Sequence, residues 1–326
     1  MTADEAGFNA LINFIKEQNE ITLISHISPD ADTLGSALAM YLLITRLGKK
    51  CEVVCENPVP RIYAFFPNAG KVVKPENAEG YSAAIAIDCA DESRMGKSAG
   101  LFYAARETAL IDHHVTNPGF AGTNLVIPRA SAVAEIINSI YLKMDMPVDK
   151  DAACCIYAGI VTDTGNLSYD NTTSSALRTV ADFVEQGLDI AKLNRLIYRT
   201  VPYSKTRVQG YVNSKIILEH GGDIGYAVLT RAQMLSFNAT DEDCEGVIDC
   251  IRDIDCVKIA VFIREGADGS FKVSLRSKEK GDVCSIAGKY GGGGHKRAAG
   301  FTSRSPLSTV IANVIDDAAE ALREDI

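Results

Sequence analysis

Short, continuous apolar runs alternate with segments of helical composition through the first half of the chain. Strands that are buried on both faces of a sheet have this uninterrupted apolar character. The runs predict strands at Ile21–Ser25, Cys51–Cys55, Ala83–Ile87 and Leu110–Ile111. Because strands that alternate with helices form a mainly parallel sheet flanked by helices, we expect an α/β domain in residues 1–185.

Amphipathic helices occupy the end of this domain and the residues after it. They are predicted at Ser174–Gly187, Asp189–Thr200 and Tyr203–Glu219. Gly187 ends the first helix, Asp189 caps the second, and Pro202 separates the second from the third. We therefore expect residues 186–222 to form a helical connector, whose apolar residues favour a homodimer.

The last third of the chain mixes strands and helices without strict alternation. Strands are predicted at Gly225–Leu229, Val257–Arg264 and Phe271–Arg276, and helices at Asp241–Ile254, Val283–Tyr290 and Pro306–Arg323. This pattern predicts a smaller α+β domain in residues 223–326.

Composition narrows the class of protein. The chain has 326 residues, which suits two domains, and with 47% hydrophobic and 23% charged residues it is typical of a soluble globular protein. Its net charge of −9 argues against binding of long duplex nucleic acid, although it leaves room for a small anionic ligand.

Neither a membrane segment nor a disulfide framework is expected. No stretch is apolar enough to span a bilayer, and the acidic N-terminal segment does not resemble a signal peptide. The nine cysteines are odd in number and irregularly spaced, which indicates reduced thiols in the cytoplasm.

Acidic and imidazole residues punctuate the ends of the predicted strands. His26, Asp30 and Asp32 follow the first strand, and we expect this acidic pair to lie in the turn before the next helix. Asp88 ends a later strand, and another runs into Asp112-His113-His114. Open α/β sheets bind ligands at this edge, and carboxylate and imidazole donors suit divalent ions such as Mn²⁺ and Mg²⁺.

Two further motifs complete the set. The segment from Cys155 ends in Asp163-Thr164-Gly165, and its composition fits a strand or a helix. Near the carboxyl end, four consecutive glycines precede His295. Peptide N–H groups without side chains above them can approach a phosphate or a nucleobase, and the Arg276 guanidinium offers a planar fork to phosphate oxygens.

Together these motifs resemble those of the DHH phosphoesterase family with its DHH-associated domain. The order of the two domains is most similar to the oligoribonuclease (nanoRNase) and 3′-phosphoadenosine 5′-phosphate phosphatase group. Ala31 stands where many relatives have Gly. The matching residues are His26-x3-Asp30-x-Asp32-x2-Gly35-Ser36, Asp88, Asp112-His113-His114-x2-Asn117, Asp163-Thr164-Gly165 and Gly291-Gly292-Gly293-Gly294-His295.

The resemblance implies a two-metal centre. One ion would be held by His26, Asp30 and Asp88, and the other by Asp32, Asp88, His113 and Asp163. Two such ions stabilise both oxygens of an in-line displacement at phosphorus. His114 would contact the transferred phosphoryl group, Asp112 would orient an imidazole, and Asn117 would contact phosphate. Arg276, Gly291, Gly292, Gly293, Gly294 and His295 would bind the nucleotide.

The activity implied is hydrolysis of very short oligoribonucleotides to nucleoside monophosphates, of phosphoadenosine phosphate to AMP, or of both. Mn²⁺ is the expected ion, and Mg²⁺ and Co²⁺ suit the same donors. A cyclic di-adenylate or linear pApA phosphodiesterase is the nearest alternative. A RecJ-like exonuclease, an inorganic pyrophosphatase and a non-catalytic metal or nucleotide sensor are less well matched by the motifs.

Overall fold

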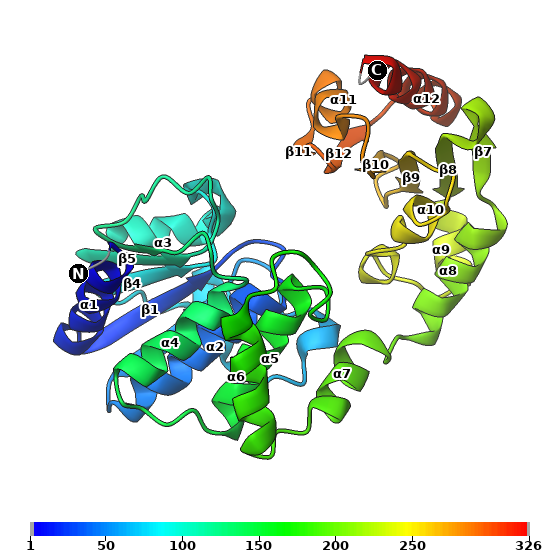
Figure 1. Cartoon of the computed structure of the whole chain (residues 1–326). Coiled ribbons are helices and arrows are strands. Elements are labelled where there is room, and N and C mark those ends of the chain that lie inside the picture. Colours follow the sequence, from blue (N-terminus) through cyan, green and yellow to red (C-terminus); the bar gives the residue numbers. More distant parts are fainter. Residues whose placement is uncertain (1–2, 325–326) are drawn as a thin grey trace. The chain divides into compact units, whose positions relative to one another are not determined.

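The computed structural model describes residues 3–324 of the chain, which divides into two compact units. The first ends at Thr200 and the second begins at Val201. Each unit contains a six-stranded sheet (Figure 1).

All strands of the first sheet are parallel, in the order β3-β2-β1-β4-β5-β6. The four strands predicted from apolar runs are confirmed within a few residues, whereas the two edge strands β3 and β6 were not predicted. The strands are β1 Glu20–Ser25, β2 Lys50–Val54, β3 Val72–Val73, β4 Ala83–Ile87, β5 Glu107–Asp112 and β6 Thr123–Val126.

Helices cover both faces of this sheet (Figure 1), as expected for parallel strands buried on both sides. In β1, Leu23 packs with the larger core beside α1, α2, α4 and α5, whereas Ile24 packs with the smaller core beside α3. The helices are α1 Ala3–Glu17, α2 Ala31–Arg46, α3 Ala99–Ala104, α4 Val133–Lys143, α5 Lys150–Asp163, α6 Ser174–Glu185 and α7 Ile190–Tyr198.

Two interpretations of the first unit are settled by its helices. The segment ending at Asp163, which fitted a strand or a helix, is the helix α5. The expectation that both acidic residues after β1 lie in a turn was wrong for Asp32. Asp30 caps α2 by accepting hydrogen bonds from the backbone N–H groups of Asp32 and Thr33, so Asp32 lies in the first helical turn.

The second unit has a mixed sheet in the order β11-β12-β10-β9-β8-β7, in which only the β8–β9 pair is parallel. The cores on its two faces involve α11 and α12 on one side and α8 to α10 on the other (Figure 1). Its elements are α8 Tyr203–Ser214, β7 Ile217–Glu219, β8 Ile224–Leu229, α9 Arg231–Ser236, α10 Asp249–Arg252, β9 Ile259–Glu265, β10 Phe271–Ser277, α11 Val283–Lys289, β11 Gly293–His295, β12 Ala298–Ser303 and α12 Leu307–Glu324.

Two predicted helices of this region were too long. The helix from Tyr203 ends at Ser214, and Ile217–Glu219 form the edge strand β7. The helix predicted over residues 241–254 is reduced to a 3₁₀ turn and the short α10, because Gly246 between them has a φ of +72° and breaks the helical path.

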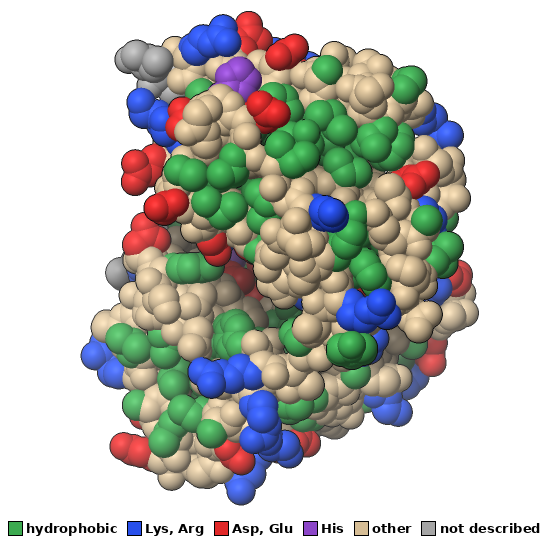
Figure 2. All heavy atoms as spheres, turned by 90° about the vertical axis from the view of Figure 1, so that its right-hand side faces the viewer, with side chains coloured by type: hydrophobic (Ala, Val, Ile, Leu, Met, Phe, Trp, Pro, Cys, Tyr) green, Lys and Arg blue, Asp and Glu red, His purple; other side chains and the backbone are tan. Residues whose placement is uncertain are grey.

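The hydropathy of the helices and the distribution of surface charge both bear on the class of protein. None of the helices in residues 3–324 is long and apolar enough to cross a membrane. On the face drawn in Figure 2, basic and acidic side chains are interspersed with apolar ones, and the described residues form no continuous basic band there.

Candidate metal centre

The predicted ligands gather at the point where the strand order of the first sheet reverses. β1 and β4 are neighbours, yet the chain leaves β1 toward β2 on one side and leaves β4 toward β5 on the other. Such a switch point leaves a crevice beyond the carboxyl ends of the strands. His26 follows β1 at this edge, and Asp88 follows β4.

We call the first cluster the His26 group, which consists of His26, Asp30 and Asp88. The Nε2 atom of His26 lies 3.6 Å from Oδ2 of Asp30 and 3.5 Å from Oδ2 of Asp88. Its Nδ1 atom lies 2.7 Å from the carbonyl oxygen of Ile27. Since a carbonyl only accepts, and this contact is shorter than the 3.1 Å from the Arg94 guanidinium to the same nitrogen, we assign a proton to Nδ1, and Nε2 is the nitrogen that faces the carboxylates.

The second cluster, the Asp163 group, consists of Asp32, His113 and Asp163. The Nε2 atom of His113 lies 3.4 Å from Oδ2 of Asp163, and its Nδ1 donates to the carbonyl oxygen of Ala130 at 3.2 Å. His113 therefore presents Nε2 to the carboxylates, as His26 does.

Asp88 lies between the two groups. One oxygen, Oδ2, faces His26, whereas Oδ1 lies 3.8 Å from Nε2 of His113 and 3.7 Å from Nδ1 of His114. The residue has a positive φ of 60° at the end of β4, where its N–H donates to the carbonyl oxygen of Ile111. A non-glycine residue in this conformation is uncommon and often marks a functional position.

The electrostatics of the cluster favour bound cations. Burial, followed by the charges of neighbouring carboxylates, raises the pKa of Asp163 from 3.8 to about 8. Burial also raises the pKa of Asp32 and of Asp88. Burial lowers the pKa of His26, but hydrogen bonds and charge from Asp30 and Asp88 outweigh it and raise this pKa to about 10.

The donor set fits a pair of divalent ions. The buried Oδ1 atom of Asp88 has no hydrogen-bond partner among the described residues. A buried carboxylate oxygen without a partner is costly, and a bound cation would satisfy it. Across three overlapping clusters, one of which joins Asp88 and His113 to His114, four carboxylates and three imidazoles offer the oxygen and nitrogen ligands that hard and borderline divalent ions take. No cysteine belongs to these clusters.

Helix packing fixes the position of Asp32. Its two carboxylate oxygens accept hydrogen bonds from the backbone N–H groups of Val133 at 2.6 Å and Ala134 at 2.9 Å, at the N-terminus of α4. Gly159 of α5 lies against the same carboxylate, since a Cβ atom there would be 2.6 Å from Asp32 Oδ1. Close packing of α5 on α2 therefore sets the place of Asp163, which ends α5.

A hydrogen-bonded chain connects His114 to Asn117. His114 Nδ1 lies 2.8 Å from Oδ1 of the fully buried Asp112, and the amide nitrogen of Asn117 donates to Asp112 Oδ2 at 2.6 Å. The same nitrogen donates to the carbonyl oxygen of Cys89, and the Asn117 oxygen accepts from the N–H of Gly119. Hydrogen bonding to Asp112 raises the pKa of His114.

Arg94 is a neighbour of the site that the sequence did not indicate. Its guanidinium Nη2 lies 3.1 Å from Nδ1 of His26, and its carbonyl oxygen accepts from the N–H of Ile27. Arg94 lies in the 3₁₀ segment that comes after Asp88. Nothing in this part of the sequence indicated a metal or substrate site. It places a permanent positive charge beside the acidic cluster.

In the second unit, Arg276 and His295 are in register across the sheet. Both pair with Ala298, Arg276 from β10 and His295 from β11, so the two side chains share one face with a small residue between them. Neighbouring strands lie ~4.8 Å apart, which places the two backbones roughly 10 Å apart.

The glycine run differs from the free loop that the sequence suggested. The N–H groups of Gly291 and Gly292 donate to carbonyl oxygens at the end of α11, and Gly293 and Gly294 belong to the edge strand β11. A Cβ atom at Gly294 would lie 2.4 Å from the carbonyl oxygen of Ala298, so close strand packing requires glycine there. At least two of the four expected N–H donors are therefore already used.

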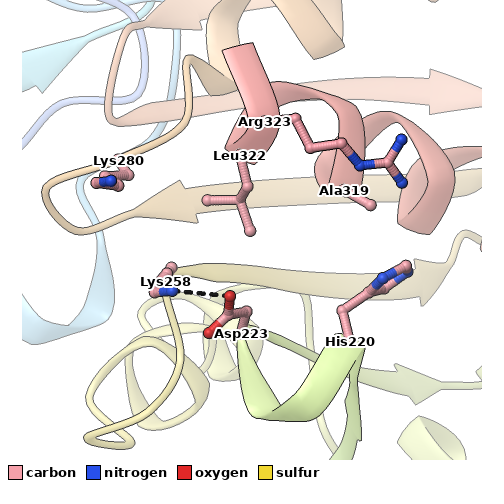
Figure 3. Close-up of a pocket in the computed structure, with 7 residues that line it drawn as sticks. All are labelled: His220, Asp223, Lys258, Lys280, Ala319, Leu322 and Arg323. Carbon is pink, nitrogen blue, oxygen red and sulfur yellow. Dashed lines mark hydrogen bonds and ion pairs between the residues drawn. The ribbon is translucent and has the colours of Figure 1, made fainter. Parts of the chain in front are cut away.

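A cavity of about 370 Å³ lies elsewhere in the second unit. Figure 3 shows the ion pair of Lys258 with Asp223 on one wall, with Leu322 opposite and the cationic Lys280 and Arg323 around them. None of its lining residues belongs to the motifs above, so this cavity is separate from the predicted nucleotide-binding residues.

Comparison with known proteins identifies the family. Residues 20–160 match the DHH family, N-terminal domain, and residues 223–326 match the DHHA1 domain. The chain is 32% identical over 313 residues to the bifunctional oligoribonuclease and PAP phosphatase NrnA of Thermus thermophilus, which covers 95% of this chain and 91% of that protein. The chain belongs to the DHH family of metal-dependent phosphoesterases.

Other relatives agree with this assignment. NrnA of Bacillus subtilis is 24% identical over 89% of this chain and 91% of that protein. The cyclic-di-AMP phosphodiesterase PdeA of Listeria monocytogenes is 26% identical over 88% of this chain but only 45% of that protein. The crystal structure of an exopolyphosphatase-related protein from Bacteroides fragilis has the same fold, with a TM-score of 0.91, 22% identity and coverage of 98% and 97% of the two chains.

Proposed function

We propose that the protein hydrolyses very short oligoribonucleotides to nucleoside monophosphates and phosphoadenosine phosphate to AMP, with Mn²⁺ as the preferred ion. The observation that carries this proposal is Asp88, which turns one carboxylate oxygen toward each group of donors. Support for the substrates comes from the relatives named NrnA, which match this chain over most of its length.

The metal ligands are proposed on the same geometry. The His26 group would hold one ion, and the Asp163 group together with Asp88 would hold the other. Two divalent ions in such a site supply Lewis acidity and stabilise the charge that develops on the attacking and leaving oxygens.

His114 is proposed as the catalytic proton donor. Its Nδ1–H group donates to Asp112, which leaves Nε2 for the substrate. The raised pKa of His114 keeps the imidazole protonated over a wider pH range, so that Nε2–H can donate to the leaving oxygen. Asp112 and Asn117 are proposed as positioning residues, because the Asn117 amide already donates to Asp112 and Cys89.

Arg276 and His295 are proposed to bind the phosphate and the nucleotide from the face that they share. The guanidinium can form paired hydrogen bonds to phosphate oxygens, and the imidazole can hydrogen-bond or stack on a base. The remaining exposed edge of β11 is the part of the glycine run that can approach the substrate.

A substrate panel tests the proposal. Purified protein with Mn²⁺ is assayed on a diadenylate, phosphoadenosine phosphate, cyclic di-adenylate and pyrophosphate. We expect turnover of the first two at rates far above the last two. Preferential hydrolysis of cyclic di-adenylate would replace this function by that of the PdeA-like relative, and absence of turnover on all four would reject a hydrolytic function on this substrate class.

A further inference from the structure

One short segment is hydrogen-bonded directly to two members of the Asp163 group and, through a bridging asparagine, to the third. It comprises residues 130–134, which run from the connection after β6 into the first turn of α4, and we call it the 130–134 segment. Its carbonyl at Ala130 accepts from His113, and its N–H groups at Val133 and Ala134 donate to Asp32. The segment therefore sets the orientation of an imidazole and of a carboxylate through its backbone.

The third member of the group is tied to the same segment through Asn171. The side-chain nitrogen of Asn171 donates to the carbonyl oxygen of Ser131 at 3.2 Å and to that of Asp163 at 3.1 Å. Displacement of the 130–134 segment would consequently remove the bonds that orient Asp32 and His113 and disturb the Asn171 bridge to the Asp163 backbone.

Glu135 anchors this segment. The side chain is only 8% exposed, and its Oε2 atom accepts hydrogen bonds from the N–H of Ser131 at 2.9 Å and from the Ser131 hydroxyl at 2.7 Å. The hydroxyl of Thr173, which caps α6, donates to the same carboxylate at 3.0 Å. The carboxylate thus connects the segment to the start of α6.

The His26 group has independent supports. His26 is oriented by the carbonyl of Ile27, and Asp30 is held by N–H groups at the start of α2. None of these contacts involves Glu135 or the 130–134 segment. A defect at Glu135 should therefore be confined to one of the two groups.

We propose that Glu135 is a positioning residue for the Asp163 group and that it selectively raises the affinity of that group for its metal ion. The inference rests on the proposed two-metal centre. Substitution of a residue that hydrogen-bonds to metal ligands, without itself binding the metal, typically lowers the metal affinity by about 10–100-fold. Glu135 would act on three ligands at once through the backbone of one segment.

Binding of Mn²⁺ to the full-length apoprotein tests this inference without any substrate. Free Mn²⁺ is measured by electron paramagnetic resonance during titration. We expect Glu135→Ala to bind one ion as the wild type does and the other at least about 10-fold more weakly. Glu135→Gln keeps an oxygen that can accept from Ser131, so it should restore most of the affinity. Equal weakening of both ions, or of neither, would overturn the proposal.

A matched control is available in the same unit. The Glu52 carboxylate also holds a loop, since it accepts from the N–H groups of Glu79 and Gly80 and from the Thr22 hydroxyl, but this loop precedes β4 at the opposite edge of the sheet. Glu52→Ala should leave both ions unaffected. Loss of an ion in this variant would show that general loosening of the unit explains the effect.

Double variants identify which ion is affected. Adding Glu135→Ala to Asp163→Asn should weaken binding little further, whereas adding it to Asp30→Asn should weaken both ions, because residues that act on one site are not additive. If Glu135→Ala does not fold, Ser131→Ala removes one bond to the carboxylate and should weaken the same ion to a smaller degree. These results do not depend on the substrate panel, so either proposal can fail alone.

Discussion

The metal-free protein should lose stability as the pH rises, and Asp163 allows a quantitative test. Its pKa is raised to about 8 in the folded protein from an ordinary value of 3.8. Between these values the folded state binds more protons than the unfolded state. The free energy of unfolding therefore falls as pH increases through this window.

The magnitude follows from the pKa difference. One such group changes the free energy of unfolding by up to about 1.4 kcal/mol per pH unit, or roughly 3 kcal/mol between pH 5 and pH 7. Because 26% of the Asp163 side chain is exposed, screening by solvent reduces this to about 2 kcal/mol. For a unit of this size that corresponds to a shift in Tm of roughly 4–8 °C.

The comparison is between the wild type and Asp163→Asn, which keeps the shape of the side chain and cannot titrate. In the presence of a chelator, calorimetry should show that the Tm falls more steeply with pH in the wild type than in the variant. The difference between pH 5 and pH 7 should be roughly 4–8 °C. His26, whose pKa of about 10 extends the same trend above its ordinary 6.5, is present in both proteins. With saturating Mn²⁺ the wild-type slope should vanish or reverse, because metal ligands must be deprotonated. If the Tm of the two proteins changed equally with pH in the presence of the chelator, Asp163 would not be the titrating group and the reasoning would be refuted.

Three substitutions test other parts of the site. Asp88→Ala should abolish Mn²⁺-dependent hydrolysis while circular dichroism and cooperative unfolding stay normal, and near-normal turnover would exclude the bridging role. Arg276→Ala should chiefly raise the KM for a dinucleotide, and an unchanged KM would count against its role in binding. Gly159→Ala places a methyl group 2.6 Å from Asp32 Oδ1 and should lower the free energy of unfolding in urea by about 1–3 kcal/mol. Unchanged stability would show that α5 can move away from Asp32 at no cost.

The meeting of His26 with Asp88 could be predicted from the sequence. Both residues follow apolar runs that are typical of buried parallel strands, and such strands end at a common edge. The sequence does not show that β1 and β4 are neighbours, because the strand order is a property of the whole sheet. The structure shows that they are. The apolar pattern was less informative for β3 and β6, which are short edge strands with partly exposed residues.

The predicted helix boundaries were wrong where a single residue, an N-cap or a glycine, decided where the helix begins or ends. The acidic pair after the first strand suggested a turn before the next helix, but Asp30 is a good N-cap, so α2 begins at Ala31 and includes Asp32. In the second unit, Gly246 within an apolar pattern was a signal for a break. The roles of Glu135 and Arg94 gave no signal in the sequence. Arg94 contacts His26, which is distant along the chain, and Glu135 holds the nearby Ser131, whose segment binds the distant Asp32.

The hydrogen bonds of Asn117 indicate a role in the Asp112-His113-His114 motif that differs from the expected contact with phosphate. The sequence made Asn117 a candidate for phosphate binding, but a side-chain amide has two N–H donors, and here they point to Asp112 and Cys89. Contact with phosphate through that nitrogen would break a bond to a buried carboxylate, which costs about 1–3 kcal/mol or more. Asp112 in turn fixes the tautomer of His114. We therefore propose that the motif orients His114: Asn117 holds Asp112, and Asp112 accepts from Nδ1 of His114, which leaves Nε2 for the substrate.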